Sequence, residues 1–225
     1  MANDTEKELA ARAALEYIHD GQVVGLGSGS TSTLAIRCIG ERVRQGLKIR
    51  GIPTSIASRD LANQLGIPLT TFDEVQEIDV TIDGADEFDP KLNLIKGGGG
   101  AMLREKIVAS ASKQLVIVTD SSKQVDLLGR FPLPLEVIGF AEPLVAKRVA
   151  GLGAKVMRRQ DPTGKPYLTD EGHHIFDCHF DRIPDPPALA RTLSEMPGIV
   201  EHGLFVGMAS VVLMAKEGEV VEFRP

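Results

Sequence analysis

The apolar positions of the first 120 residues follow two alternating spacings, one typical of strands and one typical of amphipathic helices. Short continuous apolar runs such as QVVGLG (22–27) and QLVIVTD (114–120) predict buried strands. Between such runs, apolar residues recur every three to four positions, which predicts helices with one buried face. The inner face of the helix predicted after the first strand comprises Leu34, Cys38, Ile39 and Val43.

These elements follow one another in the order αβαβαβαβ, which favours a parallel sheet covered by helices on both faces. The pattern Thr5-x-x-Glu8 reads as a capping box and predicts the start of the first helix, which extends to about Ile18. The later elements of this part are predicted as a strand in 48–55, a helix in 58–66, a strand in 77–83, a helix in 101–112 and the strand in 114–120.

The pattern changes near Phe131, where FPLPLEVIGF carries two prolines and marks a domain crossing. The segments that follow predict a βαββαβ unit of the ferredoxin type, with a hairpin turn at Asp170–Gly172. The tail, 210–223, predicts strands that rejoin the first sheet. We therefore predict an α/β fold with a Rossmann-like, mostly parallel sheet with helices on both faces (1–131 and 206–225), plus a smaller ferredoxin-like α+β domain (132–205).

Composition and charge narrow the function. The chain has 225 residues, 43% of them hydrophobic, enough to bury a core, and a net charge of −6. Because duplex nucleic acid needs concentrated basic charge, which the sequence lacks, we expect no nucleic-acid partner. The N-terminus is polar and does not read as a signal peptide, and no apolar run reaches the roughly 20 residues of a membrane span, so we expect a cytoplasmic protein without a membrane partner. Two cysteines without a CxxC pattern predict free thiols.

The first candidate site is the turn GLGSGSTS (25–32) between a strand and a helix. Glycines allow close backbone approach and the helix N-terminus offers N–H donors, so Ser28–Thr31 predict a phosphate or small-anion cradle. A dinucleotide site is an alternative, but the spacing is GxGxG, and the next strand ends in Thr54 and Ser55 with no acid for a ribose. A tight strand–helix turn without a ligand is the third alternative.

The second candidate site is DGADE, where Asp83 stands at the carboxyl end of a strand and Asp86 follows three residues later. Open α/β sheets bind ligands at such ends. Two neighbouring carboxylates shift each other's proton affinity, which suits acid and base roles. A turn that caps a helix and a magnesium site are the alternatives.

The third candidate site is KGGGGAMLREK, in which Lys96 precedes a glycine run that predicts a close-approach loop. Glu105 falls near the start of the following helix, whose dipole favours the ionised carboxylate, so it is a candidate base. A solvated glutamate on a helix face is the alternative. Lys123 follows another strand end and faces the same edge of the sheet, although a lysine there is more often a surface residue.

The cluster HHIFDCH invites a metal interpretation. Strand alternation places His173, Ile175, Asp177 and His179 on one face and Phe176, Cys178 and Phe180 on the core face. We favour exposed polar residues of an antiparallel sheet, and we predict no metal and no cofactor.

Taken together, the segments GLGSGSTS, DGADEFD, KGGGGAMLREKIVA and PGIVEHGLF resemble the signature segments of type A ribose-5-phosphate isomerases, with the spacing between them preserved from the first helix to the last strand. The resemblance implies interconversion of D-ribose 5-phosphate and D-ribulose 5-phosphate in the pentose phosphate pathway. It also implies a homodimer or homotetramer that needs no metal. One departure is Ser28, where many members of the family have Thr.

The resemblance implies a role for each matching residue. Glu105 matches the catalytic base, which moves a proton between C2 and C1 through a cis-enediolate. Asp83, Asp86 and Lys96 match the other active-site groups, although which aspartate opens the sugar ring stays open. The predicted substrate contacts are Ser28, Gly29, Ser30, Thr31, Gly84, Ala85, Gly97, Gly98, Gly99, Lys123 and, on weaker grounds, Lys7.

Two other functions are alternatives. A sugar-phosphate-binding regulatory domain without catalysis, as in some sugar-responsive repressors, would add a helix-turn-helix, for which the stretch before QVVGLG has no room. Such a domain also need not keep the Glu and Lys that this sequence has. A dehydrogenase would need the nicotinamide fingerprint and the ribose acid that the sequence lacks.

Overall fold

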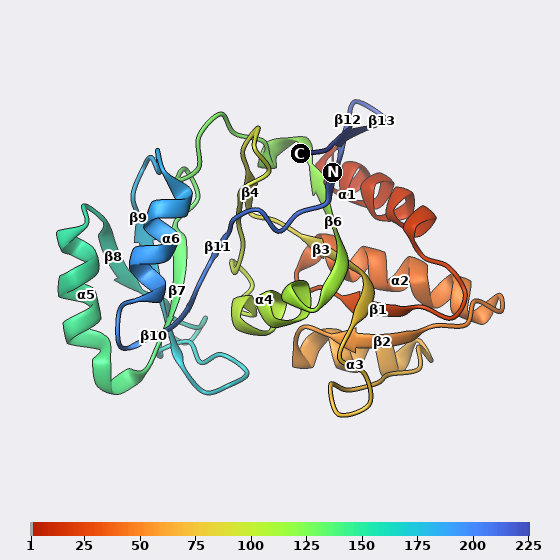
Figure 1. Cartoon of the computed structure of the whole chain (residues 1–225), viewed down its shortest axis with the longest axis horizontal. Coiled ribbons are helices and arrows are strands. Elements are labelled where there is room, and N and C mark those ends of the chain that lie inside the picture. The colour runs from red at the N-terminus through yellow and green to blue at the C-terminus, as the bar shows by residue number, and fades with distance from the viewer. Residues whose placement is uncertain (1) are drawn as a thin grey trace. The chain divides into compact units, whose positions relative to one another are not determined.

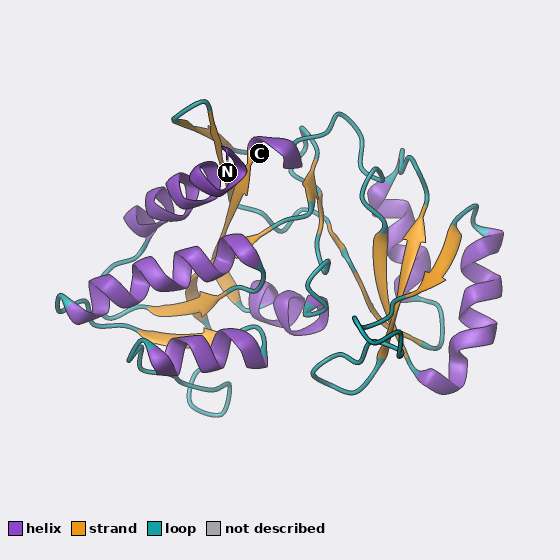
Figure 2. Cartoon of the chain, turned by 180° about the vertical axis from the view of Figure 1, so that it is seen from behind, coloured by secondary structure: helices purple, strands orange, loops and turns teal. Residues whose placement is uncertain are grey.

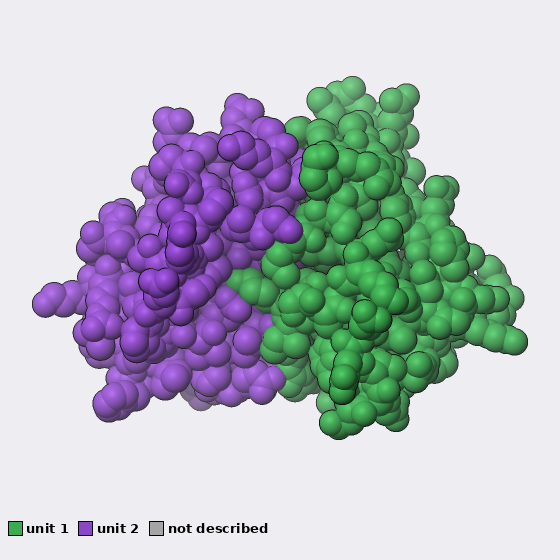
Figure 3. Space-filling view, in the orientation of Figure 1, with its two compact units in different colours: residues 1–85, 104–124, 208–225 green, residues 86–103, 125–207 purple. Residues whose placement is uncertain are grey.

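The computed structural model describes residues 2–225, with side chains described from Asp4 onward. The chain divides into two compact units, coloured separately in Figure 3. Unit 1 comprises 1–85, 104–124 and 208–225, and unit 2 comprises 86–103 and 125–207. The predicted boundary at 131 therefore falls inside unit 2, and 86–103 group with unit 2 although they lie in the first predicted domain. The division into a catalytic domain (1–131 and 206–225) and a small α+β domain (132–205) stays a prediction.

Unit 1 is built on a six-stranded sheet in the order β13-β12-β6-β3-β1-β2 (Figure 1). The five strands from β12 to β2 are parallel, and β13 is antiparallel to β12. The tail thus joins the first sheet, as predicted. The strands are β1 (Val23–Leu26), β2 (Arg50–Pro53), β3 (Ile78–Gly84), β6 (Ser112–Asp120), β12 (Val211–Lys216) and β13 (Glu219–Phe223).

Helices cover both faces of this sheet, which confirms the predicted fold class (Figure 2). On one face, the main core joins the apolar stripes of α1, α2 and α3 to buried side chains of β1, β3, β6 and β12. On the other face, Val108 of α4 packs against Val23, Ile52 and Ile78. The helices are α1 (Ala2–Ala13), α2 (Ser30–Arg44), α3 (Ile56–Gln64) and α4 (Met102–Ser110), with short 3₁₀ turns η1 (Ala14–Tyr17) and η2 (Ser121–Lys123).

The prediction of an N-terminal capping box at Thr5 and Glu8 was wrong. The first helix already begins at Ala2, so Thr5 lies within it and is not its N-cap. Glu8 instead accepts two hydrogen bonds from Arg12, one turn later on the same helix. A real capping box occurs at α3, where the side chains and backbone of Ser55 and Ser58 bond reciprocally.

Unit 2 contains the predicted βαββαβ unit. Its four-stranded antiparallel sheet has the order β10-β7-β9-β8, which is the 4-1-3-2 order of a ferredoxin-like unit. The turn at Asp170–Gly172 is present, although the segment before it forms a single bridge, Leu168 to His174, and not a strand. Its elements are β7 (Leu133–Val137), η3 (Gly139–Ala141), α5 (Glu142–Gly151), β8 (Lys155–Arg158), β9 (His174–His179), α6 (Pro186–Ser194) and β10 (Ile199–His202).

A second, three-stranded sheet of unit 2 has the order β11-β5-β4 and was not predicted. Its strands are only two residues long, which is too short to leave a periodic signal in the sequence. They are β4 (Glu87–Phe88), β5 (Leu94–Ile95) and β11 (Leu204–Phe205).

Both cysteines are free and buried, as expected. Burial raises the pKa of the Cys178 thiol to about 12, so it packs as an apolar side chain and is a poor nucleophile at neutral pH. Ile175 differs from its prediction. Strand alternation places it on the face of the polar residues His173 and Asp177, but it is as fully buried as Cys178. Strand β9 therefore has apolar contacts on both faces.

Candidate active site

The order of the strands in unit 1 defines where a ligand would bind. From β1 the chain first moves to β2 at one edge, and then returns to build β3, β6 and β12 on the other side of β1. The strand order thus reverses between β1 and β3. In open α/β sheets, ligands bind at the carboxyl ends of the strands that flank such a reversal. Ser28–Thr31 follow β1, and Asp83 lies near the carboxyl end of β3.

The turn after β1 leads directly into α2. Gly29 is the N-cap of α2 with a φ of 93°, a conformation that favours glycine, and no side chain caps the helix. Gly29 and Ser30 are exposed, while Thr31 is buried. The first N–H groups of a 15-residue helix therefore lie at an exposed turn, with the positive end of the helix dipole behind them. This is the geometry of a phosphate-binding helix N-terminus.

Asp83 fixes that turn. Its Oδ1 accepts hydrogen bonds from the N–H of Ser28 at 3.0 Å, the hydroxyl of Ser32 at 2.9 Å and the N–H of Gly84 at 2.8 Å. Gly27 must be glycine, because a Cβ there would lie 2.2 Å from Asp83 Oδ1. Asp83 itself is 1% exposed. The aspartate thus joins the ends of β1 and β3 across the point of strand reversal.

Glu105 lies in the first turn of α4, as the sequence predicts, and is 4% exposed. Of the two predicted lysines of unit 1, Lys123 ends the turn η2 after β6. Glu6 of α1 accepts hydrogen bonds from the N–H of Ser121, at 3.0 Å, and from its hydroxyl, at 2.8 Å. Lys7 is the next residue of α1 and forms an ion pair with Asp4 at 3.7 Å. The contact between α1 and η2 therefore brings the segments that carry Lys7 and Lys123 together.

In unit 2, the short sheet aligns Asp86 with Lys96. Glu87 of β4 pairs with Ile95 of β5, so the residues just outside this pair, Asp86 and Lys96, stand at the same end of the sheet. The N–H of Asp86 donates to the carbonyl of Ile95 at 2.8 Å, and the N–H of Lys96 donates to Gly203 at 2.8 Å. The Lys96 side chain is buried at 2% exposure, with its Nζ 5.4 Å from the centre of the Phe205 ring.

The glycine run after Lys96 forms a tight loop. Gly97 and Gly100 have φ values of 101° and 84°, and the N–H of Gly100 donates to the carbonyl of Gly97 at 2.9 Å. The N–H of Gly98 donates to Asp86 Oδ2 at 2.7 Å. A Cβ on Gly98 would lie 2.6 Å from Asp86 Oδ1, so this contact requires glycine. Gly98 and Gly99 are exposed.

Two further acids of the same stretch are structural. Glu87 is fully buried and accepts hydrogen bonds from the N–H groups of Gly129 and Phe131. Asp89 accepts from the N–H and the side-chain amide of Asn93, which closes the turn between β4 and β5. Asp83 and Asp86 are thus the two acids of DGADEFD that bind the turns before α2 and α4.

Comparison with known proteins decides the family. The model of the family "Ribose 5-phosphate isomerase A (phosphoriboisomerase A)" matches residues 50–219. The ribose-5-phosphate isomerase A of Nitrobacter hamburgensis is 51% identical over 96% of this chain and 95% of its own length. The ribose-5-phosphate isomerase A of Bradyrhizobium diazoefficiens is 49% identical over 100% of this chain and 98% of its own.

This chain belongs to the ribose 5-phosphate isomerase A family. It is therefore an enzyme, an aldose–ketose isomerase, and the resemblance drawn from its motifs is confirmed.

Solved structures of the family have the same fold over the whole chain. A D-ribose-5-phosphate isomerase in complex with phospho-erythronic acid superimposes with a TM-score of 0.97 at 37% identity, covering 100% of both chains. The ribose 5-phosphate isomerase A of Methanocaldococcus jannaschii superimposes with a TM-score of 0.95 at 38% identity, covering 99% of both chains.

The sequence analysis missed several residues that support the turn after β1. In unit 1, the Ser28 hydroxyl bonds to the hydroxyls of Thr54 and Ser55, both at 2.7 Å. The sequence pattern uses Thr54 and Ser55 only as an argument against a dinucleotide site and does not predict this contact. Their position after the neighbouring parallel strand was the available signal, because parallel strands end at the same edge. Ser32, which donates to Asp83, lies in the predicted turn but one residue beyond the predicted substrate contacts Ser28–Thr31.

The histidine cluster is used within unit 2. His173 Nδ1 lies 2.9 Å from the buried carboxylate of Glu136, His174 pairs with Glu142, and Asp177 pairs with Arg159. Among residues 4–225, whose side chains are described, no group of three or more His, Cys, Asp or Glu side chains is arranged to hold a metal ion.

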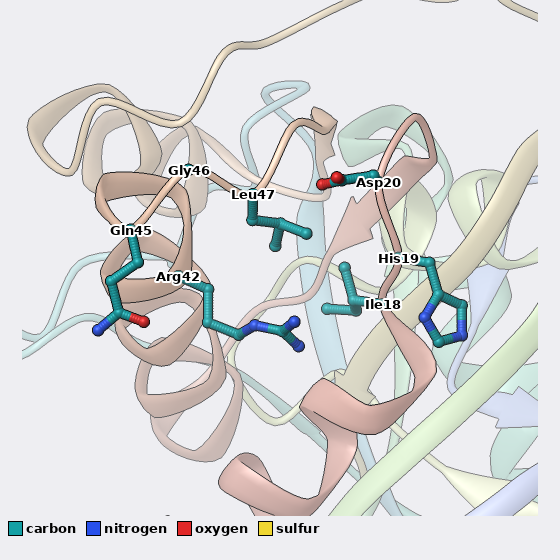
Figure 4. A pocket seen from close by; sticks show the side chains of 7 residues that line it. All are labelled: Ile18, His19, Asp20, Arg42, Gln45, Gly46 and Leu47. Atoms are coloured by element: carbon teal, nitrogen blue, oxygen red, sulfur yellow. The ribbon is translucent and has the colours of Figure 1, made fainter.

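A hollow of about 500 Å³ in unit 1 contains none of the predicted isomerase residues (Figure 4). It lies at the amino end of β1, where Arg42 extends from α2 toward Ile18. Arg42 Nη1 already donates to the carbonyl of Leu15 at 2.9 Å. Since ligands of parallel sheets bind at the carboxyl ends of strands, the Ser28–Thr31 end of β1, and not this hollow, is the candidate site. The hollow is lined by Ile18, His19, Asp20, Arg42, Gln45, Gly46 and Leu47.

Proposed function

We propose that this isomerase interconverts D-ribose 5-phosphate and D-ribulose 5-phosphate, in the pentose phosphate pathway, by metal-independent proton transfer through a cis-enediolate. The observation that carries the proposal is the uncapped, exposed N-terminus of α2, held by a buried aspartate at the strand reversal of the sheet, in a chain of this family. The structure of a relative in complex with phospho-erythronic acid, a small phosphorylated acid, supports a phosphate-bearing ligand.

The phosphate is bound by the turn after β1 together with lysines of unit 1. The N–H groups of Gly29–Thr31 and the hydroxyls of Ser30 and Thr31 donate to its oxygens, and Lys123 and Lys7 supply positive charge. Gly84 and Ala85, just after Asp83, contact the sugar. Tight binding of the phosphate holds the substrate in one orientation, so that its reacting carbons lie correctly against the catalytic groups.

Glu105 removes the proton from C2 of the open-chain aldose and returns it to C1. Its carboxylate is buried at the start of α4, which keeps water away from the proton in transfer. A positioned base of this kind accelerates proton transfer by roughly 10²–10⁴-fold. Asp83 or Asp86 moves the proton that opens the sugar ring.

Lys96 and the N–H groups of Gly97 and Gly99 in the glycine loop stabilise the enediolate oxygen that becomes negative in the transition state, while the N–H of Gly98 binds Asp86. Losing one preorganised donor of this type lowers kcat by about 10²–10³-fold. The ammonium of Lys96 is buried beside Phe205, so its charge acts in a medium of low dielectric constant, where it is stronger than in water.

The remaining parts of the proposal concern the setting of the enzyme. We propose a cytoplasmic homodimer or homotetramer whose partner is a small sugar phosphate and not a nucleic acid or a membrane. Among the helices of residues 2–225, none combines the length and the hydropathy that crossing a membrane requires.

The test is formation of ribulose 5-phosphate from ribose 5-phosphate by the purified protein in excess EDTA. Full activity in EDTA is expected, because carboxylates and a lysine carry the chemistry. Activity that disappears with EDTA and returns with a divalent cation would contradict the metal-independent mechanism. Absence of turnover with and without metal would contradict the proposed substrate.

A further inference from the structure

The glycine loop of unit 2 is held from its carbonyl side by one arginine. Arg159 Nη1 donates to the carbonyls of Gly97 and Gly98, both at 3.0 Å. The other guanidinium N–H groups meet Asp177, with Nε donating to Oδ2 at 2.9 Å and Nη2 donating to Oδ1. The side chains of Arg159 and Asp177 are only 14% and 21% exposed. The bidentate pair with Asp177 therefore fixes the plane of the guanidinium group, and the remaining nitrogen, Nη1, holds the two carbonyls.

Tyr167 completes the support. Its hydroxyl donates to the carbonyl of Gly99 at 3.3 Å, and its ring lies with its centre 5.8 Å from the Arg159 guanidinium carbon. The N–H of Tyr167 also donates to the carbonyl of Arg159 at 3.0 Å, which ties the two residues together through the backbone. Two side chains thus hold three successive carbonyls of the loop.

Holding a carbonyl also aims an N–H group. In a trans peptide the C=O and the N–H of the same unit point in opposite directions. The carbonyl of Gly97 shares its peptide with the N–H of Gly98, and the carbonyl of Gly98 shares its peptide with the N–H of Gly99. Both N–H groups therefore point away from Arg159, and that of Gly98 ends on Asp86 Oδ2. The positive charge at the carbonyls also polarises these peptides, which makes their N–H groups better donors.

We infer that Arg159 is a positioning residue of the isomerase reaction: oriented by Asp177 and Tyr167, it aims the N–H groups of Gly98 and Gly99 at Asp86 and at the developing oxyanion of the substrate. The N–H of Gly98 is aimed at Asp86 and that of Gly99 at the oxyanion. The inference rests on the proposed function, in which N–H groups of this loop stabilise the enediolate. Arginine is required, because a lysine ammonium cannot bind a carboxylate with two parallel hydrogen bonds and hold two carbonyls at once.

The test is Arg159→Lys, which keeps a positive charge opposite Asp177 and so avoids a buried, unpaired carboxylate. Because a displacement of about 1 Å at a reacting centre lowers rate up to 10²-fold, we expect kcat to fall about 10–100-fold. KM for ribose 5-phosphate is expected to stay within about threefold, since the phosphate is bound by the other turn. The matched control is Arg158→Lys on the same strand, whose side chain pairs with Glu142 at the surface. Its kcat is expected to equal that of the wild type.

A second measurement, hydrogen–deuterium exchange of a peptide containing residues 97–101, separates loop positioning from general damage. Faster exchange there in Arg159→Lys, with unchanged exchange in β6 and β12, supports the inference. Unchanged kcat in Arg159→Lys overturns it, as does an equal loss in Arg158→Lys. An inactive wild type would overturn the proposed function and the catalytic part of this inference together, whereas an active wild type with an unimpaired Arg159→Lys overturns this inference alone.

Discussion

The turn after β1 in unit 1 and the glycine loop after β5 in unit 2 are both held in place by side-chain hydrogen bonds, but the side chains come from different parts of the chain. Each joins a strand to a helix, and each donates one N–H to an aspartate of the segment DGAD, Ser28 to Asp83 and Gly98 to Asp86. The first turn is otherwise held by hydroxyls from the neighbouring strand end, Thr54 and Ser55. The second is otherwise held by Arg159 and Tyr167, more than 60 positions further along the chain.

The comparison shows that the two aspartates have a structural task beside any proton transfer. Asp83 is buried and accepts a hydrogen bond from the buried Ser32, so it anchors its turn to the folded core of unit 1. Asp86 holds the exposed Gly98, so its loop depends on directed contacts and contributes less to stability. We therefore expect mutations at the first turn to lower stability and mutations at the second loop to lower turnover.

Among the variants that test this contrast between the two turns, the largest effect is expected for Gly98→Ala. A Cβ there would lie 2.6 Å from Asp86 Oδ1, so Asp86 must move and its hydrogen bond with the Gly98 N–H is lost. We expect kcat to fall by about 10²-fold or more with little change in Tm. The matched variant is Gly99→Ala, because nothing lies within 4 Å of a Cβ at that position. It should lose clearly less activity, and equal losses would show that glycine is needed only for flexibility.

The next effect separates the two aspartates by stability. Asp83→Ala leaves the Ser28 and Gly84 N–H groups and the Ser32 hydroxyl without their carboxylate, and should lower the free energy of unfolding by about 2–3 kcal/mol. Asp86→Ala should lower it by less than about 1 kcal/mol, because water replaces the acceptor of the exposed Gly98. Urea unfolding of both variants measures this difference. Equal losses would contradict the contrast between a core turn and a surface loop.

A smaller effect is expected for the hydroxyl of Ser28. Ser28→Ala removes its bonds to Thr54 and Ser55 and should cost about 1 kcal/mol of unfolding free energy. Because the turn then binds phosphate less firmly, KM should rise several-fold while kcat changes little. Ser28→Thr restores the hydroxyl and should behave like the wild type in both assays. An unimpaired Ser28→Ala would mean that the backbone alone holds the turn.

The smallest effect is a pH dependence at Glu6. Hydrogen bonds from the N–H and hydroxyl of Ser121 hold the Glu6 pKa below its ordinary value of 4.5. A carboxylate whose pKa is lowered by folding contributes stability above its unfolded pKa and loses it as the pH falls through the folded pKa. Wild type should therefore have a higher Tm than Glu6→Gln at pH 7, and the difference should shrink below about pH 4.5. A constant difference from pH 7 to pH 3 would contradict this linkage.

The sequence predicts the first turn better than the second for a physical reason. The buried strands of unit 1 leave continuous apolar runs, and parallel strands end at one edge, so Ser28–Thr31 and Asp83 could be placed together before the structure was known. The supports of the glycine loop come from Arg159 and Asp177, which meet only because β8 and β9 pair in antiparallel register. In the sequence, Asp177 stands among histidines and suggests a polar face of a strand, and nothing local indicates that it pairs with Arg159.

Local signals in the sequence also failed in one place and were incomplete in another. The Thr5-x-x-Glu8 pattern has the form of a capping box, yet α1 already begins at Ala2 and Glu8 pairs with Arg12. Lys96 is recognisable as a candidate from its position before the glycines, but its burial beside Phe205 depends on the pairing of β5 with β11. Contacts between two-residue strands more than 100 positions apart leave no local pattern in the sequence.

The central claim is that a buried carboxylate at position 105 takes the proton from carbon, and Glu105→Gln tests it most directly. The amide keeps the size of the side chain but cannot accept the proton, so kcat should fall by about 10³-fold or more, within the range of a general base. KM for ribose 5-phosphate should stay within about threefold, and the exposed Glu41→Gln should match the wild type. A Glu105→Gln variant that folds and retains kcat within tenfold of the wild type would contradict the claim.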